Sequence, residues 1–320
     1  MIQYKDMILG KDDSGRRLDR LIRIYLPHLP LPHLYAAIRK GLIRINGTKT
    51  TMHYKTVQGD TLTIADFLLD RGRKETGGAG QPCTAVRCDS TPDAPLCKGK
   101  KTGAFSVLMH TPDLLIVNKA SGMVVHGENS LQSLLFESLP HLHCAHGLAF
   151  RMGALHRLDK DTSGIICFSQ SLLGAQWFSQ CLREKSIKKY YIGIVEGRMP
   201  DGTIATHEKG EALTHCTRLA YNRAEQLSCM LFTLVTGRKH QIRKHAQHAG
   251  HPLIGDIRYG STRSLFTHQS YVLHAWRLYF PHGRLPQVPA CVEADCPRPV
   301  KTLLDTLFPH WYAGAVRSAT

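Results

Sequence analysis

Hydrophobic positions near the N-terminus recur with a helical period in two neighbouring segments. In GRRLDRLIRIYLP, arginines take one side of a helix and apolar residues take the other, the apolar set being Leu18, Leu21, Ile22 and Tyr25. After a proline-containing break, LPHLYAAIRKG predicts a second short helix that ends at Gly41. LIRING and VQGDTLTI then alternate like strands, the first leading into an Asn46-Gly47 hairpin turn. These patterns predict a small unit over residues 1–70 in which helices precede strands.

The composition changes abruptly between residues 71 and 103. Glycine, proline, serine, threonine and charged residues dominate this stretch, and neither a strand period nor a helical period survives in it. We therefore expect a flexible linker over residues 71–103, followed by a larger domain over residues 104–320.

Strand-like and helix-like patterns are mixed in this larger domain. The segments that predict strands are Val107–Met109, Leu114–Asn118, Met123–Val125, GIICFSQS, KKYYIGIVEG, LSCMLFTLVTG and, last, YVLHAWRLYF. Helical spacing occurs in LLGAQWFSQCLREKS and in the strongly basic RKHQIRKHAQHAG. Because strands and helices do not alternate strictly, the expected fold class is α+β with a large mixed, mostly antiparallel sheet.

The charge of the chain narrows the class of partner. Lys and Arg number 41 against 25 Asp and Glu, which gives a formal net charge of +16. Such a surplus favours a polyanionic partner, and nucleic acid is the first candidate. No secretion signal, lipidation signal or apolar run long enough to span a bilayer is found, so no membrane partner is expected. The ten cysteines form no short repeating framework, which is typical of reduced thiols in a cytoplasmic protein.

Two sets of residues raise the question of a metal site. The pairs Cys83/Cys88 and Cys291/Cys296 each have a four-residue gap rather than the tighter spacing of zinc knuckles. Four histidines crowd one segment without a zinc-protease pattern: His240, His245, His248 and His251. A basic, partly exposed face explains these histidines better, and we expect no metal.

The stretch GALHRLDKDTSG, residues 153–164, carries the clearest candidate chemistry. Asp159 and Asp161 lie two positions apart, and two adjacent acids at one site would repel each other. We therefore expect one working acid and one turn-forming acid, and spacing alone leaves open which is which. A kinase catalytic loop is excluded because Leu158 breaks its register, and a serine hydrolase is excluded because no G-x-S-x-G elbow is present.

Five blocks in register give this stretch a family context. GALHRLDKDTSG, KKYYIGIVEG and LVTGRKHQIRKHAQHAGHPLIGDIRYG, with DLLIVNKASG before them and LHAWRLYFPHG after them, resemble the RluA-type pseudouridine synthases. The resemblance covers residues 105–283. Residues 14–68 resemble the S-four domain, an alpha-L RNA-binding motif, which matches the RluC/RluD branch of that family. The resemblance implies the pseudouridine synthase fold with a small N-terminal RNA-binding domain.

The same resemblance implies roles for individual residues. Asp159 corresponds to the catalytic aspartate, Tyr191 to the tyrosine that lies against the target uracil, and Arg243 to the arginine that pairs with the catalytic acid. Other residues are expected to contact substrate or RNA: Arg157, which would enter the RNA stack, Ile242 in the apolar floor, His240, Arg238 and Lys189, and, in the N-terminal domain, Arg16, Arg20, Arg39 and Lys40.

The implied activity is isomerisation of specific uridines to pseudouridine in RNA. The reaction involves no net redox change and no hydrolysis, so no cofactor is expected. Large-subunit ribosomal RNA is the expected partner and the protein is expected to be a monomer. Three alternatives stay open: a transfer-RNA synthase, a catalytically inactive RNA-binding or ribosome-assembly factor, and an enzyme that hydrolyses a glycoside or nucleoside. One departure from the family pattern is that Lys119-Ala120-Ser121-Gly122 replaces the usual Lys-Pro-x-Gly.

Overall fold

The computed structural model describes residues 2–70, 101–139, 148, 150–206, 212–263, 271–281, 283 and 285–319. These residues form two compact units. The first takes in the described parts of Met1–Pro95, Leu139–Met152 and Gln170–Leu173, and the second takes in those of Leu96–Ser138, Gly153–Ser169 and Gly174–Thr320. Most of the predicted linker, residues 71–100, lies outside the described residues.

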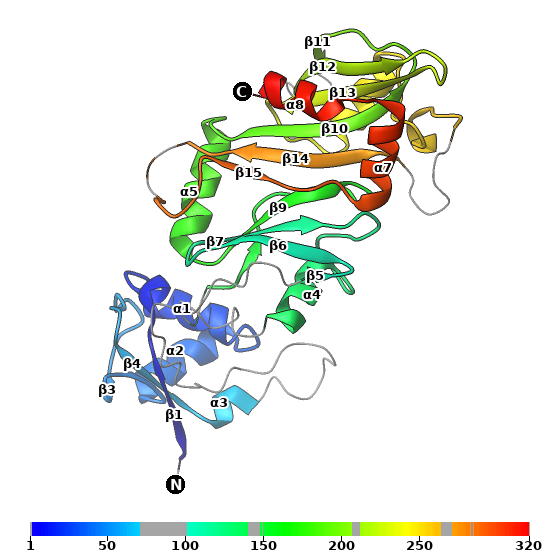
Figure 1. The fold of residues 1–320 in the computed structure, drawn as a ribbon. Coiled ribbons are helices and arrows are strands. Elements are labelled where there is room, and N and C mark those ends of the chain that lie inside the picture. The colour runs from blue at the N-terminus through cyan, green and yellow to red at the C-terminus, as the bar shows by residue number, and fades with distance from the viewer. Residues whose placement is uncertain are drawn as a thin grey trace. The chain divides into compact units, whose positions relative to one another are not determined.

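The first unit packs helices against a four-stranded sheet (Figure 1). Its elements are β1 (Tyr4–Ile8), η1 (Lys11–Asp13), α1 (Leu18–Tyr25), α2 (Leu31–Lys40), β2 (Ile43–Ile45), β3 (Thr48–Lys49), β4 (Thr61–Ala65) and α3 (Phe67–Asp70). The strand order is β1-β4-β2-β3, and every neighbouring pair is antiparallel. The two predicted helices and the hairpin are confirmed. The expectation that helices come first was wrong, because β1 precedes them and pairs with β4.

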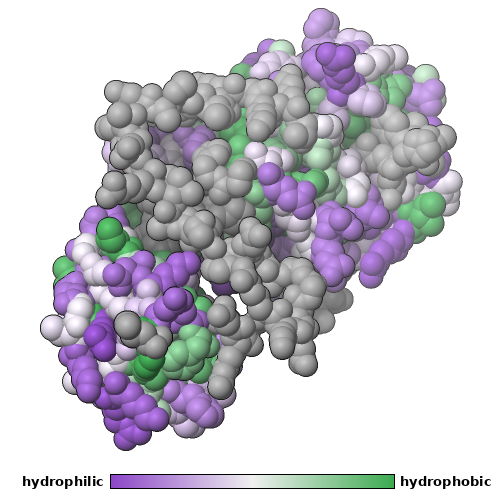
Figure 2. Space-filling model, turned by 90° about the horizontal axis from the view of Figure 1, so that it is seen from below, coloured by the Kyte–Doolittle hydropathy of each residue, from purple (hydrophilic) through white to green (hydrophobic). Residues whose placement is uncertain are grey.

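The amphipathic pattern of α1 and α2 explains the core of this unit. Leu18, Leu21 and Ile22 are completely buried, and they pack with Leu34 and Ile38 of α2 in one cluster with the strands. Helix α2 ends where the sequence predicts, because Gly41 takes a left-handed conformation with φ of 71°. Hydrophilic residues cover much of the described surface on the face that Figure 2 shows.

Two buried acids bring later segments of the chain into the first unit. A carboxylate oxygen of Asp13 accepts a hydrogen bond from the backbone N–H of Leu148 at 2.8 Å, and Asp12 accepts one from Leu172 at 3.1 Å. Backbone donors that are removed from water need such partners. Residues 148 and 170–173 therefore belong to the first unit, although the range predicted for the catalytic domain, 104–320, contains them.

The second unit is built on one long sheet. Its strands are β5 (Lys101–Thr102), β6 (Phe105–His110), β7 (Leu114–Lys119), β8 (Gly153–Ala154), β9 (Ser163–Ser169), β10 (Lys188–Glu196), β11 (Gly202–Thr206), β12 (Ala212–Asn222), β13 (Leu227–Leu234), β14 (Leu273–Tyr279) and β15 (Cys291–Glu293). Its helices are α4 (Leu131–Ser138), α5 (Leu172–Arg183, which begins in the first unit), α6 (Gln241–His248), η3 (Ile257–Tyr259), α7 (Arg298–Leu307) and α8 (Trp311–Ala319). None of the helices in the described ranges has the length and apolar character needed to cross a bilayer.

The strand order confirms the predicted fold class. The main path runs β11-β12-β13-β10-β14-β9-β7-β6-β5, with β15 beside β14 and β8 beside β9 (Figure 1). The junction of β14 with β9 is parallel and the other described strand pairs are antiparallel. Gly164 makes this junction possible, because a Cβ at this residue would lie 2.2 Å from the carbonyl oxygen of Ala275. The sheet is thus mixed and mostly antiparallel.

Several predicted elements need correction. Met123–Val125 is not a strand. YVLHAWRLYF is not the last strand, because β15 follows it, and the helices α7 and α8 were not predicted. Val300 and Leu304 of α7 and Trp311 and Ala315 of α8 are buried against one face of the sheet, beside Ile192 of β10 and other residues. Residues 101 and 102, assigned to the linker by the sequence pattern, pair with β6.

His274 of β14 links β9 to the residue that follows β15, at the parallel junction. Its Nε2 donates to the carbonyl oxygen of Ala294 at 3.0 Å, so its Nδ1 accepts from the hydroxyl of Ser163 at 2.9 Å. The side chain is completely buried. Burial lowers the pKa of His274 to about 4, although the nearby acids and the bond to Ala294 act in the opposite direction. The imidazole is therefore neutral at neutral pH.

We expect the protein to lose stability as the pH falls from about 6.5 to about 4. In this range His274 is protonated in the unfolded chain, whereas its lowered pKa keeps it neutral in the folded chain. The contribution of this residue is full above pH 6.5, and at pH 5 about 2 kcal/mol of it is lost. Urea unfolding at pH 7.5 and pH 5 measures the difference. A His274→Gln variant should show a smaller difference between the two pH values. An equal difference in both proteins would contradict this role.

Candidate active site

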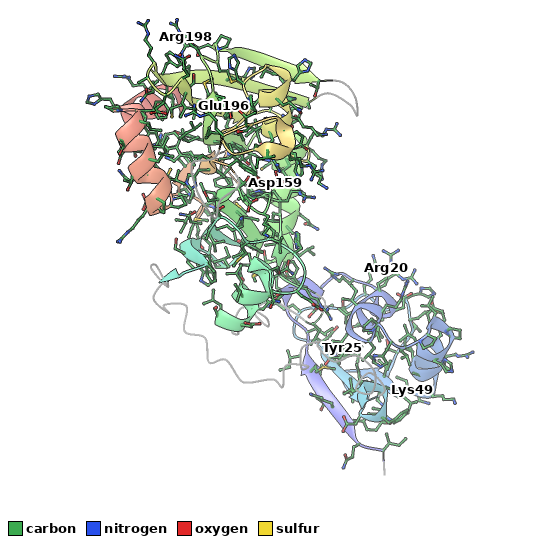
Figure 3. All side chains as sticks on the ribbon, turned by 90° about the vertical axis from the view of Figure 1, so that its right-hand side faces the viewer. Arg20, Tyr25, Lys49, Asp159, Glu196 and Arg198 are labelled. Atoms are coloured by element: carbon green, nitrogen blue, oxygen red, sulfur yellow. The ribbon has the colours of Figure 1, made fainter. Side chains whose placement is uncertain are left out.

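A cavity of about 440 Å³ opens in the second unit beside the segment 155–162. It is lined by Leu155, His156, Arg157, Leu158, Asp159, Thr162, Leu182, Arg183, Lys185, Ile187, Lys189, Tyr191, Leu234, Val235, Thr236, Gly237, Arg238, Lys239, His240, Gln241, Ile242, Arg243 and Leu273. Asp159 is the carboxylate in this set, and Figure 3 labels it within the second unit. Asp161 does not line the cavity. The position relative to the cavity therefore distinguishes Asp159 from Asp161, which spacing alone could not do.

The turn that follows β7 holds the backbone of the two residues directly after Asp159. The ammonium group of Lys119 donates to the carbonyl oxygens of Ala120, Met123 and Lys160 at 2.8–2.9 Å. Ser121 donates its hydroxyl to the carbonyl oxygen of Asp161 at 2.7 Å. Lys119 is completely buried, and burial lowers its pKa to about 8 against the opposing charges of Asp161 and Asp159. The Lys-Ala-Ser-Gly turn thus fixes the loop that carries the acid.

Arg243 makes its strongest contact with a residue that sequence reasoning missed. Its Nε and one terminal nitrogen donate to the two carboxylate oxygens of Asp256 at 2.7 and 2.8 Å. Its other terminal nitrogen lies 3.7 Å from Oδ2 of Asp159. Arg243 was expected to pair with Asp159. The ion pair is present, but it is the longer of the two, because Asp256 takes the bidentate face of the guanidinium.

Aromatic rings and the charge of Asp256 set the state of Arg243. The guanidinium carbon lies 4.4 Å from the ring centroid of Tyr271 and 4.7 Å from that of Tyr259. Burial alone would lower the pKa of Arg243, but the hydrogen bonds to Asp256 and the charges of both acids raise the pKa above its ordinary value. A permanent positive charge therefore faces Asp159 with an orientation that Asp256 fixes.

His240 faces the other oxygen of Asp159. Its Nε2 lies 3.5 Å from Oδ1, while its Nδ1 forms a hydrogen bond of 2.8 Å with the hydroxyl of Tyr259. Burial and the positive charges of Arg243, Arg258 and Lys239 lower the pKa of His240, which outweighs the opposing effect of Asp159. A neutral imidazole that accepts from Tyr259 presents its N–H to the acid. This tautomer is assigned from the hydrogen-bond partners.

Tyr191 and Ile242 contribute to the apolar surface of the cavity. Both side chains are buried, at 7% and 4% exposure, so only their cavity-facing atoms are accessible. Burial, followed by the charge of Asp159, raises the pKa of Tyr191 well above its ordinary range. The hydroxyl therefore stays protonated, and the ring can act as a flat surface beside the carboxylate.

His156 closes the inner side of the cavity as a neutral group. Its Nε2 accepts the backbone N–H of Cys167 at 3.1 Å, and its ring stacks on Phe178 with 5.8 Å between centroids. Burial, followed by the charge of Lys189, lowers the pKa of His156 to about 3. It is thus a structural support, and it cannot act as an acid at neutral pH.

Comparison with known proteins identifies this arrangement. The family model described as RNA pseudouridylate synthase matches residues 113–248, a range that contains Asp159, Tyr191 and Arg243. Residues 113–248 form an RNA pseudouridylate synthase domain. The resemblance inferred from the sequence blocks is thereby confirmed for the synthase family.

Curated relatives match most of the chain around this synthase domain. The ribosomal large subunit pseudouridine synthase C of Vibrio vulnificus (strain CMCP6) is 29% identical, and the alignment covers 87% of this chain and 89% of the relative. The protein of the same name from Escherichia coli (strain K12) is 27% identical over 95% of this chain and 96% of its own. A solved structure, human RNA pseudouridylate synthase domain containing 4, has a TM-score of 0.52 and 21% identity over 63% of this chain and 92% of its own, which shows a shared fold.

The residues predicted from the sequence fall into two groups. Eight of them line the cavity of the synthase domain: Arg157, Asp159, Lys189, Tyr191, Arg238, His240, Ile242 and Arg243. Arg157 and Arg238 are exposed and stand at its open side. The other four, Arg16, Arg20, Arg39 and Lys40, belong to the first unit, where Figure 3 labels Arg20. Arg16 is half-buried and donates to the carbonyl oxygen of Asp12, whereas the other three are exposed.

Three supporting residues of the synthase site gave no clear signal in the sequence. Asp256 and Tyr259 lie in HPLIGDIRYG, the end of the third family block, but neither residue was assigned a role from the sequence. Gln241 accepts from Thr236 and from the backbone N–H of Arg238, both at 2.9 Å, and so shapes the turn before α6.

The crowded histidines point in separate directions. His240 contacts Tyr259, the Nε2 of His245 lies 3.1 Å from the hydroxyl of Thr206, and the Nδ1 of His251 lies 2.8 Å from the carbonyl oxygen of Glu196. Among the residues that the structure describes, no three His, Cys, Asp or Glu side chains are grouped as a metal site.

Proposed function

We propose that this protein is an RNA pseudouridine synthase that isomerises specific uridines in large-subunit ribosomal RNA, with Asp159 as its catalytic residue. One observation carries the proposal. A carboxylate lies in a cavity of suitable size for a nucleotide, 3.7 Å from Arg243 and 3.5 Å from His240, beside the buried ring of Tyr191.

The geometry supplies what the isomerisation needs from the protein. The bond between the ribose and N1 of uracil breaks, the base turns, and C5 bonds to the ribose in its place. Asp159 provides an anionic oxygen that can attack the nucleotide, and Arg243 and His240 keep that oxygen oriented. Because both reacting fragments stay in one cavity, the base can rejoin the sugar rather than be lost.

The target uridine has to leave its stack to reach Asp159. Extrusion of a base costs a few kcal/mol. Stacking on Tyr191, worth about 1–3 kcal/mol, offsets part of this cost, and Ile242 adds apolar surface to the site. Arg157, exposed at the mouth of the cavity, is positioned to fill the space that the uridine leaves.

The choice of ribosomal RNA follows from the named relatives, which act on the large ribosomal subunit according to their names. A transfer-RNA synthase is the nearest alternative. Deleting the gene in the source organism and marking pseudouridine chemically along both RNA classes separates the two. The proposal predicts that sites disappear from large-subunit RNA. Loss confined to transfer RNA would contradict it.

A catalytically inactive RNA-binding factor would need none of the supporting contacts around Asp159. The buried Asp256–Arg243 pair and the three hydrogen bonds from Lys119 hold a geometry that binding alone does not require. We therefore favour the enzyme over the idle factor.

We further propose that the first unit is an S-four-like RNA-binding domain. Its exposed basic residues on α1 and at the end of α2 support this role: Arg20, Arg23, Arg39 and Lys40. Exposed Arg and Lys side chains contact phosphates without reading sequence. We propose in addition a cytoplasmic monomer. The buried free cysteines Cys167, Cys216 and Cys229 support a reducing compartment.

Replacing Arg20, Arg39 and Lys40 by Ala together should weaken RNA binding and reduce its salt dependence. Loss of three phosphate contacts makes the negative slope of log affinity against log salt concentration shallower by about 2. Filter binding between 50 and about 300 mM salt measures this slope. A control variant with Ala at the exposed Arg223, Arg298 and Lys301 of the second unit should bind like the unaltered protein. Equal slopes in all three proteins would exclude the proposed RNA-binding face.

A further inference from the structure

Lys189 and Tyr191 face the same side of β10. Residues two apart on a strand share a face and lie roughly 6.6 Å apart. Tyr190 and Ile192 point to the opposite face, where they pack in the cluster that includes α7 and α8. Lys189 and Tyr191 therefore project together into the cavity, which both line. A ring stacked on Tyr191 would have one of its edges within reach of the Lys189 side chain.

The ammonium group of Lys189 has no acidic partner among the described residues. Its neighbours are uncharged: the neutral His156, the thiol of Cys167, and the backbone at Gly237, where a Cβ would lie 3.7 Å from Nζ. The side chain is half-buried. The contrast with Lys119, which donates to three carbonyl oxygens, is clear. A desolvated cation without a partner is unfavourable in the free protein, and it is suited to a ligand that brings negative charge.

The other charged residues of the cavity are less suited than Lys189 to contact a negatively charged ligand inside it. Asp159 occupies one side, and its oxygens face Arg243 and His240. Arg157, Arg238 and Lys239 are exposed, where backbone phosphates can reach them, and Arg183 and Lys185 line the rim from α5 and the turn after it. Lys189 is less exposed than these residues, and its neighbours are His156 and the backbone at Gly237.

We propose that Lys189 contacts a carbonyl oxygen of the extruded uracil and stabilises the negative charge on the base after its bond to the ribose breaks. This inference rests on the proposed function. When the bond breaks, its electron pair stays with the base, where the charge is shared among N1, O2 and O4, and a carboxylate oxygen of Asp159 bonds to the ribose carbon that N1 leaves. C5 of the base later bonds to the same carbon as the carboxylate leaves with its electron pair. The C5 proton then goes to solvent, and N1 takes up a proton. A fixed cation at O2 or O4 stabilises the base most strongly after the bond to N1 has broken and before the bond to C5 has formed.

The test measures single-turnover release of tritium from [5-³H]uridine-labelled large-subunit RNA fragments, with enzyme in excess. Lys189→Met should lower the rate about 100-fold, while the RNA dissociation constant changes less than about twofold. Lys189→Arg should recover most of the rate. The matched control is Lys188→Met, because Lys188 is exposed on the same strand, and it should react like the unaltered protein.

The pH profile adds a readout that a structural role would not change. Burial lowers the pKa of Lys189, against the opposing effect of Cys167. The rate of the unaltered enzyme should therefore fall at alkaline pH, this limb should move to higher pH in Lys189→Arg, and it should be absent in Lys189→Met. The other titratable groups that face this part of the cavity, His156, Cys167 and Tyr191, have pKa values shifted away from the neutral range.

Three outcomes would overturn the inference. Lys189→Met could react at the unaltered rate; it could lose RNA affinity with an unaltered rate, which would indicate a phosphate contact; or both Lys189 variants could fail equally with lowered melting temperatures, which would indicate a structural role. If the unaltered protein releases no tritium from any fragment, the proposed function fails and this inference fails with it. Release by the unaltered protein and by Lys189→Met at equal rates removes only the role of Lys189.

Discussion

Asp159→Asn is expected to abolish formation of pseudouridine and to leave RNA binding almost unchanged. The amide keeps the size of the carboxylate but cannot supply the anionic oxygen that faces Arg243 at 3.7 Å. We expect the rate to fall at least roughly 10⁴-fold, which corresponds to about 5.4 kcal/mol of transition-state stabilisation. Tritium release from C5 of labelled uridine measures the rate, and filter binding measures the affinity.

Asp161→Asn is the matched control for this variant. Asp161 lies two residues away, does not line the cavity, and holds its loop through its backbone carbonyl, which accepts from Ser121. We expect this variant to keep its rate within about tenfold, the effect of a small loss of loop order. Loss of activity in Asp161→Asn with activity retained in Asp159→Asn would reverse the assignment of the working acid.

Removal of Arg243 is expected to have the second largest effect, and it acts on two properties at once. Arg243→Ala takes the positive charge away from Asp159, which should lower the rate roughly 10²- to 10³-fold. It also leaves the carboxylate of Asp256, which is 1% exposed, without its partner. An uncompensated buried charge costs about 3–5 kcal/mol of folding stability. The melting temperature should therefore fall together with the rate.

A double variant separates these two effects. Arg243→Met with Asp256→Asn replaces the buried ion pair by neutral groups of similar volume, a change that is often close to neutral for stability. We expect the double variant to recover the melting temperature and to keep the low rate. Recovery of the rate together with the stability would mean that Arg243 only supports the fold.

The sequence predicts those parts of the fold that depend on local patterns. The helical spacing of Leu18, Leu21 and Ile22 placed α1, and the Asn46-Gly47 pair placed the hairpin, with positive φ at both residues. β1 was missed because YKDMI is a short edge strand whose exposed positions break the alternation. In α7 and α8 the apolar residues are spaced for a helix, but the prolines at 297, 299 and 309 interrupt the segment.

The candidate site was predictable for the residues to which the family resemblance gives a role and not for the residues that support them, although the blocks contain both. The blocks carry Asp159, Tyr191 and Arg243, and the fold brings them to one cavity. The bidentate contact of Asp256 with Arg243 depends on the path of the chain after α6, which no local period encodes. The hydrogen bond from Lys119 to the carbonyl oxygen of Lys160, beside Asp159, likewise joins segments about forty residues apart in sequence.

The most direct measurement is a nucleoside analysis of large-subunit ribosomal RNA after incubation with the purified, chelator-treated protein. Digestion to nucleosides and chromatography then quantify uridine, pseudouridine and free uracil. We predict that pseudouridine appears in the same amount as uridine disappears, without free uracil, and that Asp159→Asn forms none. Free uracil among the products, or equal pseudouridine formation by Asp159→Asn, would contradict the proposed role of Asp159 in isomerising uridine.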